Sequence, residues 1–350
     1  MPTVLADTLR DLMRAIFEAV GTPPDTARFV GDSLVDANLA GHDSHGVIRI
    51  LHYVEMVRAG KVDPRAEPCV VHRFGATATL DANWGWGQPA MMLATETAIE
   101  LARQYGLGAA VVRRCYHIGR VAPYVETIAR AGMIGIATTN AGPAVAPYGA
   151  RSRVLGTNPI AWAAPRADGK EPICLDIATA AVAEGKLRVA RAKGAPAPPG
   201  AIVNVEGHPS LDPNDFYAGG ALLPFGAHKG SGLSVLVQIL GRGLASMDRD
   251  QLLSHRGGNG PFVLAIDPAA FGPREAFIEA VEAQCAEITS ATPAEGFDAV
   301  LLPGEPELAA RAERLANGIP VPETTWNELL ALAAELGIGV AGPAQASPSQ

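Results

Sequence analysis

The sequence predicts an α/β fold with an α+β arrangement, in which helical N- and C-terminal parts surround a central mixed sheet. Three observations predict it. Apolar residues recur at helical spacing over the first 60 residues, short β-rich runs alternate with helical stretches from residue 69, and helical spacing returns after residue 270. A chain of 350 residues is long enough for two domains. We expect a helical domain from residues 1–68 plus about 270–340, an α/β domain over about 69–269, and a disordered tail at 341–350.

Three helices are predicted at the N-terminus. Apolar spacing predicts the first over residues 5–20 and the second over residues 29–40, separated by a Gly-Thr-Pro-Pro turn. The third is expected to be capped by Asp43 or Ser44 and to end at Gly60. No strand is expected before residue 69.

The central segment alternates predicted strands with helices at 88–104 and 121–131. The β-rich runs are CVVHRF (69–74), TATLDA (77–82), GAAVVRRC (108–115), MIGIATT (133–139), PIAWAAP (159–165) and PICLDIAT (172–179).

A Pro- and Gly-rich stretch follows at residues 194–232 and is too long for an ordinary connection, so we expect an irregular functional loop. An apolar helix at 233–245 and a strand at 261–267 come next. Three helices are then predicted at 274–291, 306–317 and 323–336.

Composition excludes several classes of protein. Lys and Arg number 28 against 36 Asp and Glu, so the formal net charge is −8, which opposes binding to nucleic acids or anionic membranes. Charged residues interrupt the N-terminal apolar spacing, and no uncharged apolar run reaches 18 residues. The four cysteines are far apart, which favours a reducing, cytoplasmic setting.

Two glycine patterns resemble a dinucleotide-binding fingerprint, and neither has the context it needs. GIGVAG at 337–342 is followed by only eight residues, so no helix can receive a pyrophosphate. GWGQPA at 85–90 precedes a helix, but the acidic ribose ligand expected about twenty residues on is absent. We interpret the second as a helix-packing turn.

The segment GHDSHGVIRILHYVE (41–55) carries the most chemistry. On one continuous helix, His45, Arg49 and Tyr53 would form a single stripe at i, i+4 and i+8. Apolar residues on the opposite face would dock on the core. Imidazole, guanidinium and phenol suit the binding of a carboxylate and the movement of a proton, although a merely solvated face has the same geometry.

Two other patterns leave alternatives open. In GAHKGSG (226–232), Lys229 and a helix N-terminus could bind an anion, or the loop could be a flexible turn. His42 and His45 could form a metal pair, but no second ligand cluster appears at suitable spacing, so we expect no metal. A serine hydrolase lacks its G-x-S-x-G motif.

Seven motifs occur in the order typical of the type 2 malate/L-lactate dehydrogenase family, which the chain resembles from about Leu5 to Gly337. They are DSHGVIRILHY, CYHIGR, GTNPIAWAAP, LDIATAAVAEGKL, GHPSLDP, HKGSGLS and LPGEPE. The resemblance implies an NAD- or NADP-dependent oxidoreductase with a non-Rossmann nucleotide-binding fold, usually a homodimer. It would act on a small 2-hydroxy or 2-oxo acid. Alternatives are reduction of a cyclic 2-imino acid at the same site and a non-catalytic nucleotide-binding homologue.

The resemblance also implies roles for individual residues. His45, Arg49, His117 and Asp176 would be catalytic, and Arg49, Tyr53 and His117 would bind the substrate. A protonated His45 of ordinary pKa would neutralise the charge that grows on the substrate, with Asp176 on its other ring nitrogen. The implied cofactor-binding residues are Asn158, Asp176, Ile177, Ala178, Thr179, Ala180, His228, Lys229, Pro303, Gly304 and Glu305.

The chain departs from the family pattern at four positions. Ala180 replaces a hydroxyl residue, His228 replaces an aromatic residue, and Arg120 and Pro123 occupy positions that are normally small or flexible. These departures affect the expected substrate more than the reaction class.

Overall fold

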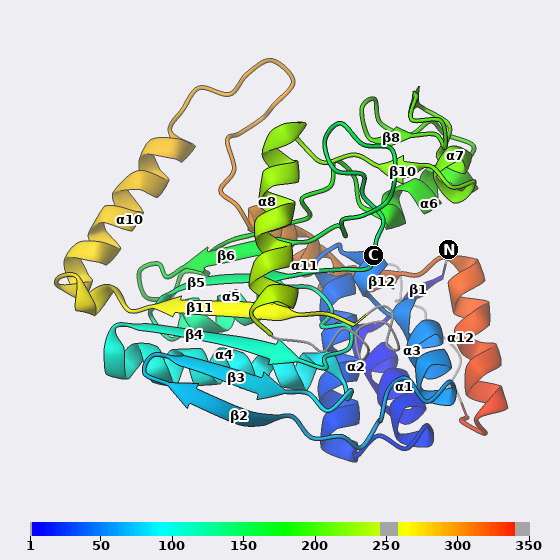
Figure 1. Cartoon of the computed structure of the whole chain (residues 1–350), viewed down its shortest axis with the longest axis horizontal. Helices are drawn as coiled ribbons and strands as arrows, with labels where there is room; N and C mark the ends of the chain where they lie inside the picture. The colour runs from blue at the N-terminus through cyan, green and yellow to red at the C-terminus, as the bar shows by residue number, and fades with distance from the viewer. Residues whose placement is uncertain (1, 246–257, 340–350) are drawn as a thin grey trace, which may run out of the picture.

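The computed structural model of the chain describes residues 2–245 and 258–339 and is drawn in Figure 1. The tail predicted as disordered at 341–350 lies outside the described residues. A seven-stranded sheet forms the centre, and each predicted strand is part of it. In spatial order the strands are β2 (Cys69–Phe74), β3 (Thr77–Asp81), β4 (Leu107–Arg113), β11 (Pro261–Ile266), β5 (Ile134–Thr139), β6 (Ile160–Ala164) and β7 (Ile173–Ile177).

The sheet is mixed, as predicted. Within it, β3 and β4 pair in parallel, whereas the other five neighbouring pairs are antiparallel. Strand β11 lies between β4 and β5, although it follows them by more than 120 residues. The late part of the chain therefore completes the middle of the sheet.

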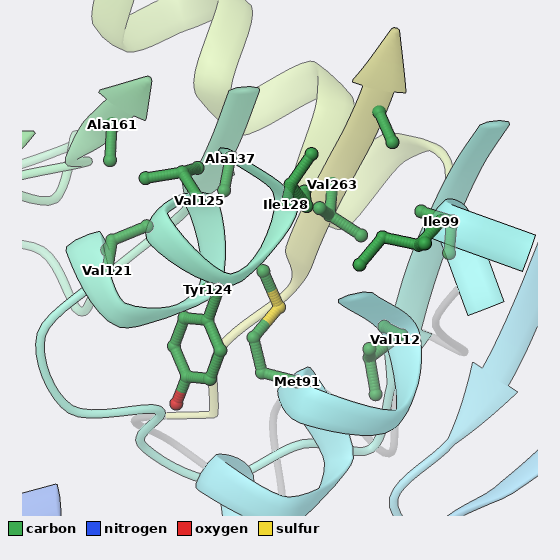
Figure 2. Packing of buried hydrophobic residues seen from close by; sticks show 14 of the residues in the cluster. Met91, Ile99, Val112, Val121, Tyr124, Val125, Ile128, Ala137, Ala161 and Val263 are labelled. Carbon is green, nitrogen blue, oxygen red and sulfur yellow. The ribbon is translucent and has the colours of Figure 1, made fainter. Parts of the chain in front are cut away.

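Two helices cover one face of the sheet, α4 (Gly87–Tyr105) and α5 (Ala122–Arg130) (Figure 1). On α4, Ala90, Ala94, Ala98 and Ala102 recur every four residues and are fully buried, so the helix lies close to the strands. Gly108 on β4 permits this approach, because a Cβ there would overlap the carbonyl oxygen of Ala98. Figure 2 shows the apolar side chains that fill the layer between helices and sheet.

The opposite face carries α8 (His228–Gln238), which continues into a π-helical turn at Ile239–Gly243 (Figure 1). The sequence predicts a loop over 226–232 followed by a helix from 233. In the structure the helix begins five residues earlier, at His228, so Lys229 lies in its first turn.

The N-terminal helices pack with the end of the chain. They share one apolar cluster with residues around 319–333. The α11 helix contacts α2, α12 contacts α3, and strand β1 (Thr3–Val4) pairs antiparallel with β12 (Ile319–Pro320). The helices are α1 (Ala6–Ala19), α2 (Pro24–Leu39), the 3₁₀ turn η1 (Asp43–His45), α3 (Arg49–Arg58), α11 (Glu305–Asn317) and α12 (Glu323–Glu335).

Helix α10 (Arg274–Thr289), which follows the 3₁₀ turn η3 (Pro268–Ala270), lies at the other end of the sheet from the terminal helices (Figure 1). The only buried residue of this helix is Cys285. Its Glu282 forms ion pairs with Arg166 and Lys170, which follow strand β6. The division into domains near residues 68 and 270 remains a proposal, favoured by the separate apolar clusters of the sheet and of the terminal helices.

The stretch at 194–232 is more ordered than predicted. A three-stranded sheet in the order β10 (Ala221–Leu222), β8 (Ile202–Val203), β9 (Pro209–Ser210) packs with two short helices around a small apolar cluster. Its strands have two residues each, which is too short for a periodicity signal. The helices are α6 (Glu184–Ala192) and α7 (Pro213–Tyr217).

Candidate active site

The helix predicted to start at Asp43 or Ser44 begins instead at Arg49. Asp43–His45 form the separate 3₁₀ turn η1, and Gly46 is extended (φ −87°, ψ −154°). Asn38 on α2 holds this break, because its Oδ1 accepts the Val47 amide at 2.8 Å and its Nδ2 donates to Asp43 at 2.6 Å. A Cβ at position 46 would overlap the Asn38 side chain. The prediction of one continuous helical stripe from His45 through Arg49 to Tyr53 is therefore wrong.

The turn nevertheless brings two imidazoles together beside a guanidinium. The rings of His45 and His117 stack with centroids 5.8 Å apart and planes 20° apart. Arg49 Nε donates to the carbonyl oxygen of Ser44 at 2.6 Å, and Ser44 Oγ lies 3.0 Å from His45 Nδ1. Sequence positions 45, 49 and 117 thus meet in one place.

Both imidazoles are neutral at pH 7. Burial, followed by the positive charge of Arg49, lowers the pKa of His45 to about 3. The same two causes lower the pKa of His117 well below its usual value. The expectation of an ordinary pKa for His45 is thus wrong for the substrate-free protein. An anion that offsets the charge of Arg49 would raise both pKa values.

Tyr53 is fully buried, and its hydroxyl lies 2.6 Å from His117 Nδ1. Gln88 Nε2 donates to the same hydroxyl at 3.0 Å. Burial raises the pKa of Tyr53, which keeps the phenol protonated. The structure therefore joins Tyr53 to His117, and its expected contact with substrate remains a proposal.

Asp176 lies on β7 and faces the start of α5. Its Oδ2 accepts the amides of Val121 at 2.9 Å and Ala122 at 2.8 Å, in place of the expected contact with a ring nitrogen of His45. Burial raises the pKa of Asp176, while these amides and the charge of Arg120 oppose the rise. The carboxylate thus anchors the helix beside the two histidines.

Asp176 also borders a cavity of about 390 Å³ between the sheet edge and helices α2, α5 and α11. Arg120 reaches into its wall with a side chain that is 10% exposed, and its Nε is buried without a partner among the described residues. Gly304 adopts φ +98° at the start of α11. A neighbouring cavity of about 240 Å³ touches Pro303 and Glu305. The residues that line the larger cavity include His42, Arg120, Asp176, Gly304, Glu307 and Arg311.

The other expected cofactor residues form a second group. The Phe225 amide donates to the carbonyl oxygen of Thr179 at 3.0 Å, which joins the 177–180 segment to the chain leading into His228 and Lys229. His228 packs its ring against Tyr148, with centroids 5.9 Å apart. Asn158 is fully buried, and its amide donates to Ser234 and Gln238 on α8, so its bonds are structural.

Two residues were missed by the sequence analysis. Asn38 shapes the η1 turn and Gln88 supports Tyr53, and both are buried amides whose partners are distant in sequence or in separate elements. Periodicity marks neither. Within residues 2–245 and 258–339, no group of three or more His, Cys, Asp and Glu side chains could hold a metal ion.

Two imidazoles beside a guanidinium are groups that can bind an anion and move a proton. The model of the family described as malate/L-lactate dehydrogenase matches residues 4–330. The chain therefore belongs to the malate/L-lactate dehydrogenase family and is an oxidoreductase. Membership of this dehydrogenase family implies a nicotinamide cofactor.

Individual relatives agree with this placement. The chain is 35% identical to hydroxycarboxylate dehydrogenase B of Escherichia coli O157:H7 over 342 residues, covering 95% of this chain and 94% of the relative. It is 35% identical to a Δ1-pyrroline-2-carboxylate/Δ1-piperideine-2-carboxylate reductase of Pseudomonas syringae pv. tomato over 339 residues, covering 95% and 96%. The sulfolactate dehydrogenase structure from Methanocaldococcus jannaschii superposes with a TM-score of 0.88 at 32% identity, covering 97% and 98%.

The larger cavity contains one group that suits the phosphates of a nicotinamide dinucleotide. Arg120 is a cation in its wall whose buried Nε has no partner among the described residues, while its terminal Nη2 pairs with Glu126 at 3.3 Å. None of the helices within the described part of the chain has the length and apolar character needed to span a membrane.

Proposed function

We propose that this protein interconverts a small 2-oxo acid and the corresponding 2-hydroxy acid, using NAD or NADP. The observation that carries the proposal is the meeting of His45, Arg49 and His117. When bound, the nicotinamide supplies or accepts the hydride. Catalytic roles for His45, Arg49, His117 and Asp176 are part of this proposal.

Arg49 holds the substrate carboxylate. A guanidinium binds a carboxylate through two parallel hydrogen bonds, which orients the neighbouring carbonyl as well as attracting the anion. Its Nε is already held by the Ser44 carbonyl, so the terminal nitrogens are the ones directed to substrate. The same binding offsets the charge of Arg49, which is the second cause, after burial, of the low pKa of His45.

His45 accepts the proton in one direction of the reaction and donates it in the other. In hydroxy-acid oxidation the neutral imidazole accepts the hydroxyl proton. In reduction, the bound carboxylate on Arg49 lets His45 take up a proton and donate it to the oxygen on which negative charge grows. The shared position of Arg49 beside both substrate and imidazole links substrate binding to protonation of the catalytic group.

The cavity beside Asp176 would hold the cofactor, with Arg120 available to a phosphate and Pro303, Gly304 and Glu305 to the nucleotide. A second group of contacts comes from residues 177–180 and from His228 and Lys229. A non-Rossmann mode of binding is part of the proposal, and the predominantly antiparallel sheet supports it, since a Rossmann site needs adjoining parallel strands.

Reduction of a cyclic 2-imino acid is the second candidate. The 35% identity to the pyrroline- and piperideine-carboxylate reductase favours it, and the same arrangement of carboxylate clamp and proton donor would serve a C=N bond.

The test is a rate assay with a panel of 2-oxo acids and cyclic 2-imino acids, each with NADH and with NADPH. The proposal predicts turnover of at least one 2-oxo acid that depends on cofactor. Turnover restricted to imino acids would favour the second candidate, and cofactor binding without any turnover would contradict both.

We also propose that the protein is a homodimer joined through α8. From residue 230 to 241 the chain carries no charged side chain, and no described element covers the outer side of α8 in Figure 1. Such apolar surfaces are typical of obligate homodimer interfaces, so the occupant is a second copy of this chain. The apolar residues that are at least 37% exposed here are Leu233, Val235, Leu236, Ile239 and Leu244.

Light scattering after size-exclusion chromatography tests the interface. The wild type is expected to have twice the chain mass of 36.3 kDa, and Leu236→Glu is expected to shift it toward the monomer. Phe74→Glu, at an exposed residue of the edge strand β2, is the control and should leave the dimer intact. A monomeric wild type would contradict the proposal.

A cytoplasmic location completes the proposal. All four cysteines are free thiols, and three of them are buried, which accords with a reducing compartment.

A further inference from the structure

A short line of hydrogen bonds leads from the buried start of α4 to His117. Gln88 is the second residue of α4 and is fully buried, as is Tyr53. Gln88 Nε2 lies 3.0 Å from the Tyr53 hydroxyl, which lies 2.6 Å from His117 Nδ1. Gln88 is absent from the residues that the family resemblance identifies.

The backbone fixes the direction in which the protons point along this line. The Gly119 amide, which can only donate, lies 3.3 Å from His117 Nδ1, so this nitrogen is an acceptor. The Tyr53 hydroxyl must then donate to the same nitrogen. Its oxygen is left to accept, and the group that donates to it is the amide NH₂ of Gln88.

This orientation leaves the carbonyl Oε1 of Gln88 buried without a hydrogen-bond partner among the described residues. A buried unpaired carbonyl destabilises a fold, and such groups are found where function requires them. The start of α4 also lies against the His117 backbone, since a Cβ at Gly87 would overlap the carbonyl oxygens of Tyr116 and His117. Gln88 is therefore held near His117 by its hydrogen bond to Tyr53 and by the close packing of the preceding residue, Gly87, against the His117 backbone.

We propose that Gln88 is a positioning residue that acts through Tyr53 to hold neutral His117 with its proton on Nε2. The Nε2–H group then donates a hydrogen bond to the substrate heteroatom on which negative charge grows, while His45 supplies the proton. This inference rests on the proposed function for its catalytic consequence, but the tautomer of His117 can be measured without turnover.

The experiment compares the full-length wild type with Gln88→Met, which keeps the length of the side chain and removes its donor. Nitrogen-15 NMR of histidine-labelled protein reports which ring nitrogen of His117 carries the proton, with His117→Asn used for assignment. The wild type is expected in the Nε2–H form, and Gln88→Met in a mixture of both tautomers. The kcat of Gln88→Met should fall roughly 10- to 100-fold, as expected when a hydrogen-bonding catalytic group is misplaced. Its KM for the cofactor should be unchanged.

Thr95→Val is the matched control. Thr95 is also fully buried on α4, and its hydroxyl bonds only to the Met91 carbonyl within its own helix, at 2.9 Å. This variant should keep the wild-type tautomer and kcat whatever its thermal stability.

A double-mutant cycle with Tyr53→Phe separates positioning from general stability. If Gln88 acts through Tyr53, adding Gln88→Met to Tyr53→Phe should not lower kcat further. An Nδ1–H tautomer in the wild type, or an unchanged tautomer and kcat in Gln88→Met, would overturn the inference. If the wild type shows no turnover but Gln88→Met still changes the tautomer of His117, the proposed function is contradicted and the positioning role is supported.

Discussion

The low pKa of His45 follows from its surroundings, since burial is joined by the charges of Arg49, His42 and Arg120, and no carboxylate of the described residues contacts its ring. A neutral imidazole is ready to accept a proton from a hydroxy acid. An anionic substrate that pairs with Arg49 removes part of the cause of the shift. Protonation of His45 is thereby coupled to substrate binding, which confines the acidic form to the complex.

Replacement of His45 tests this role. His45→Ala should lower kcat on the order of 10²- to 10⁴-fold, because the proton then has no positioned donor or acceptor. Fluorescence titration should show nearly unchanged binding of NADH or NADPH. His72→Ala, at an exposed position of the edge strand β2, is the control and should keep the wild-type kcat. Wild-type turnover in His45→Ala would remove this residue from the mechanism.

At the scale of elements, the sequence predicts the six strands of residues 69–179 and most long helices within a few residues, because their apolar side chains recur with a regular period. Helices α2 and α8 each begin five residues before the predicted start. The prediction fails at η1, where the apolar pattern continues across Gly46 while Asn38 holds the backbone away from helix. It also misses α6 and the two-residue strands around 202–222. These elements are set by tertiary contacts and carry little local signal.

The joint between α4 and His117 gives a prediction about an element. Gly87→Ala should destabilise the protein by about 1–3 kcal/mol, the usual effect of adding a methyl group where there is no space, because the Cβ would overlap two carbonyl oxygens. Its kcat should also fall, since relief of the overlap moves His117. Urea unfolding and a rate assay measure both.

Gly272→Ala is the control for this prediction, because no atom lies within 4 Å of the added Cβ and the residue has no positive φ. Its free energy of unfolding should lie within about 1 kcal/mol of the wild type. Equal stability of the two variants would show that α4 does not lie against the His117 backbone as described.

At the scale of the whole molecule, local sequence patterns do not predict the order of the strands in the sheet. Nothing local indicates that β11 enters between β4 and β5, or that the 303–305 loop lies near Asp176. Nothing local indicates, either, that His117 stacks on His45. The sequence pattern alone indicated His45, Arg49, Tyr53 and Lys229, and the family resemblance supplied the other site residues. Their mutual bonds and altered pKa values required the structure.

The lowered pKa values of His45 and His117 make global stability depend on pH. The pKa of His45 in the folded protein is about 3 and that of His117 is also well below 6.5, so between these values the unfolded chain binds more protons. Stability is therefore lost as the pH falls below about 6.5. Each imidazole contributes a slope of up to about 1.4 kcal/mol per pH unit. Asp176, whose pKa is raised, opposes this trend.

Urea unfolding of the wild type and of His45→Ala between pH 6.5 and 5 isolates one imidazole. The variant should lose less stability on acidification than the wild type, since it lacks one of the groups that must remain neutral in the folded state. Parallel curves for the two proteins would contradict the neutral, buried state assigned to His45.

The central claim is that His45, Arg49 and His117 hold a 2-oxo acid where it exchanges hydride with a nicotinamide. The most direct test uses a reduced cofactor deuterated at the transferable position of C4, with the best 2-oxo acid of the assay panel and mass spectrometry of the product. The account predicts a 2-hydroxy acid that carries one deuterium on C2. A hydroxy acid without that deuterium would contradict it.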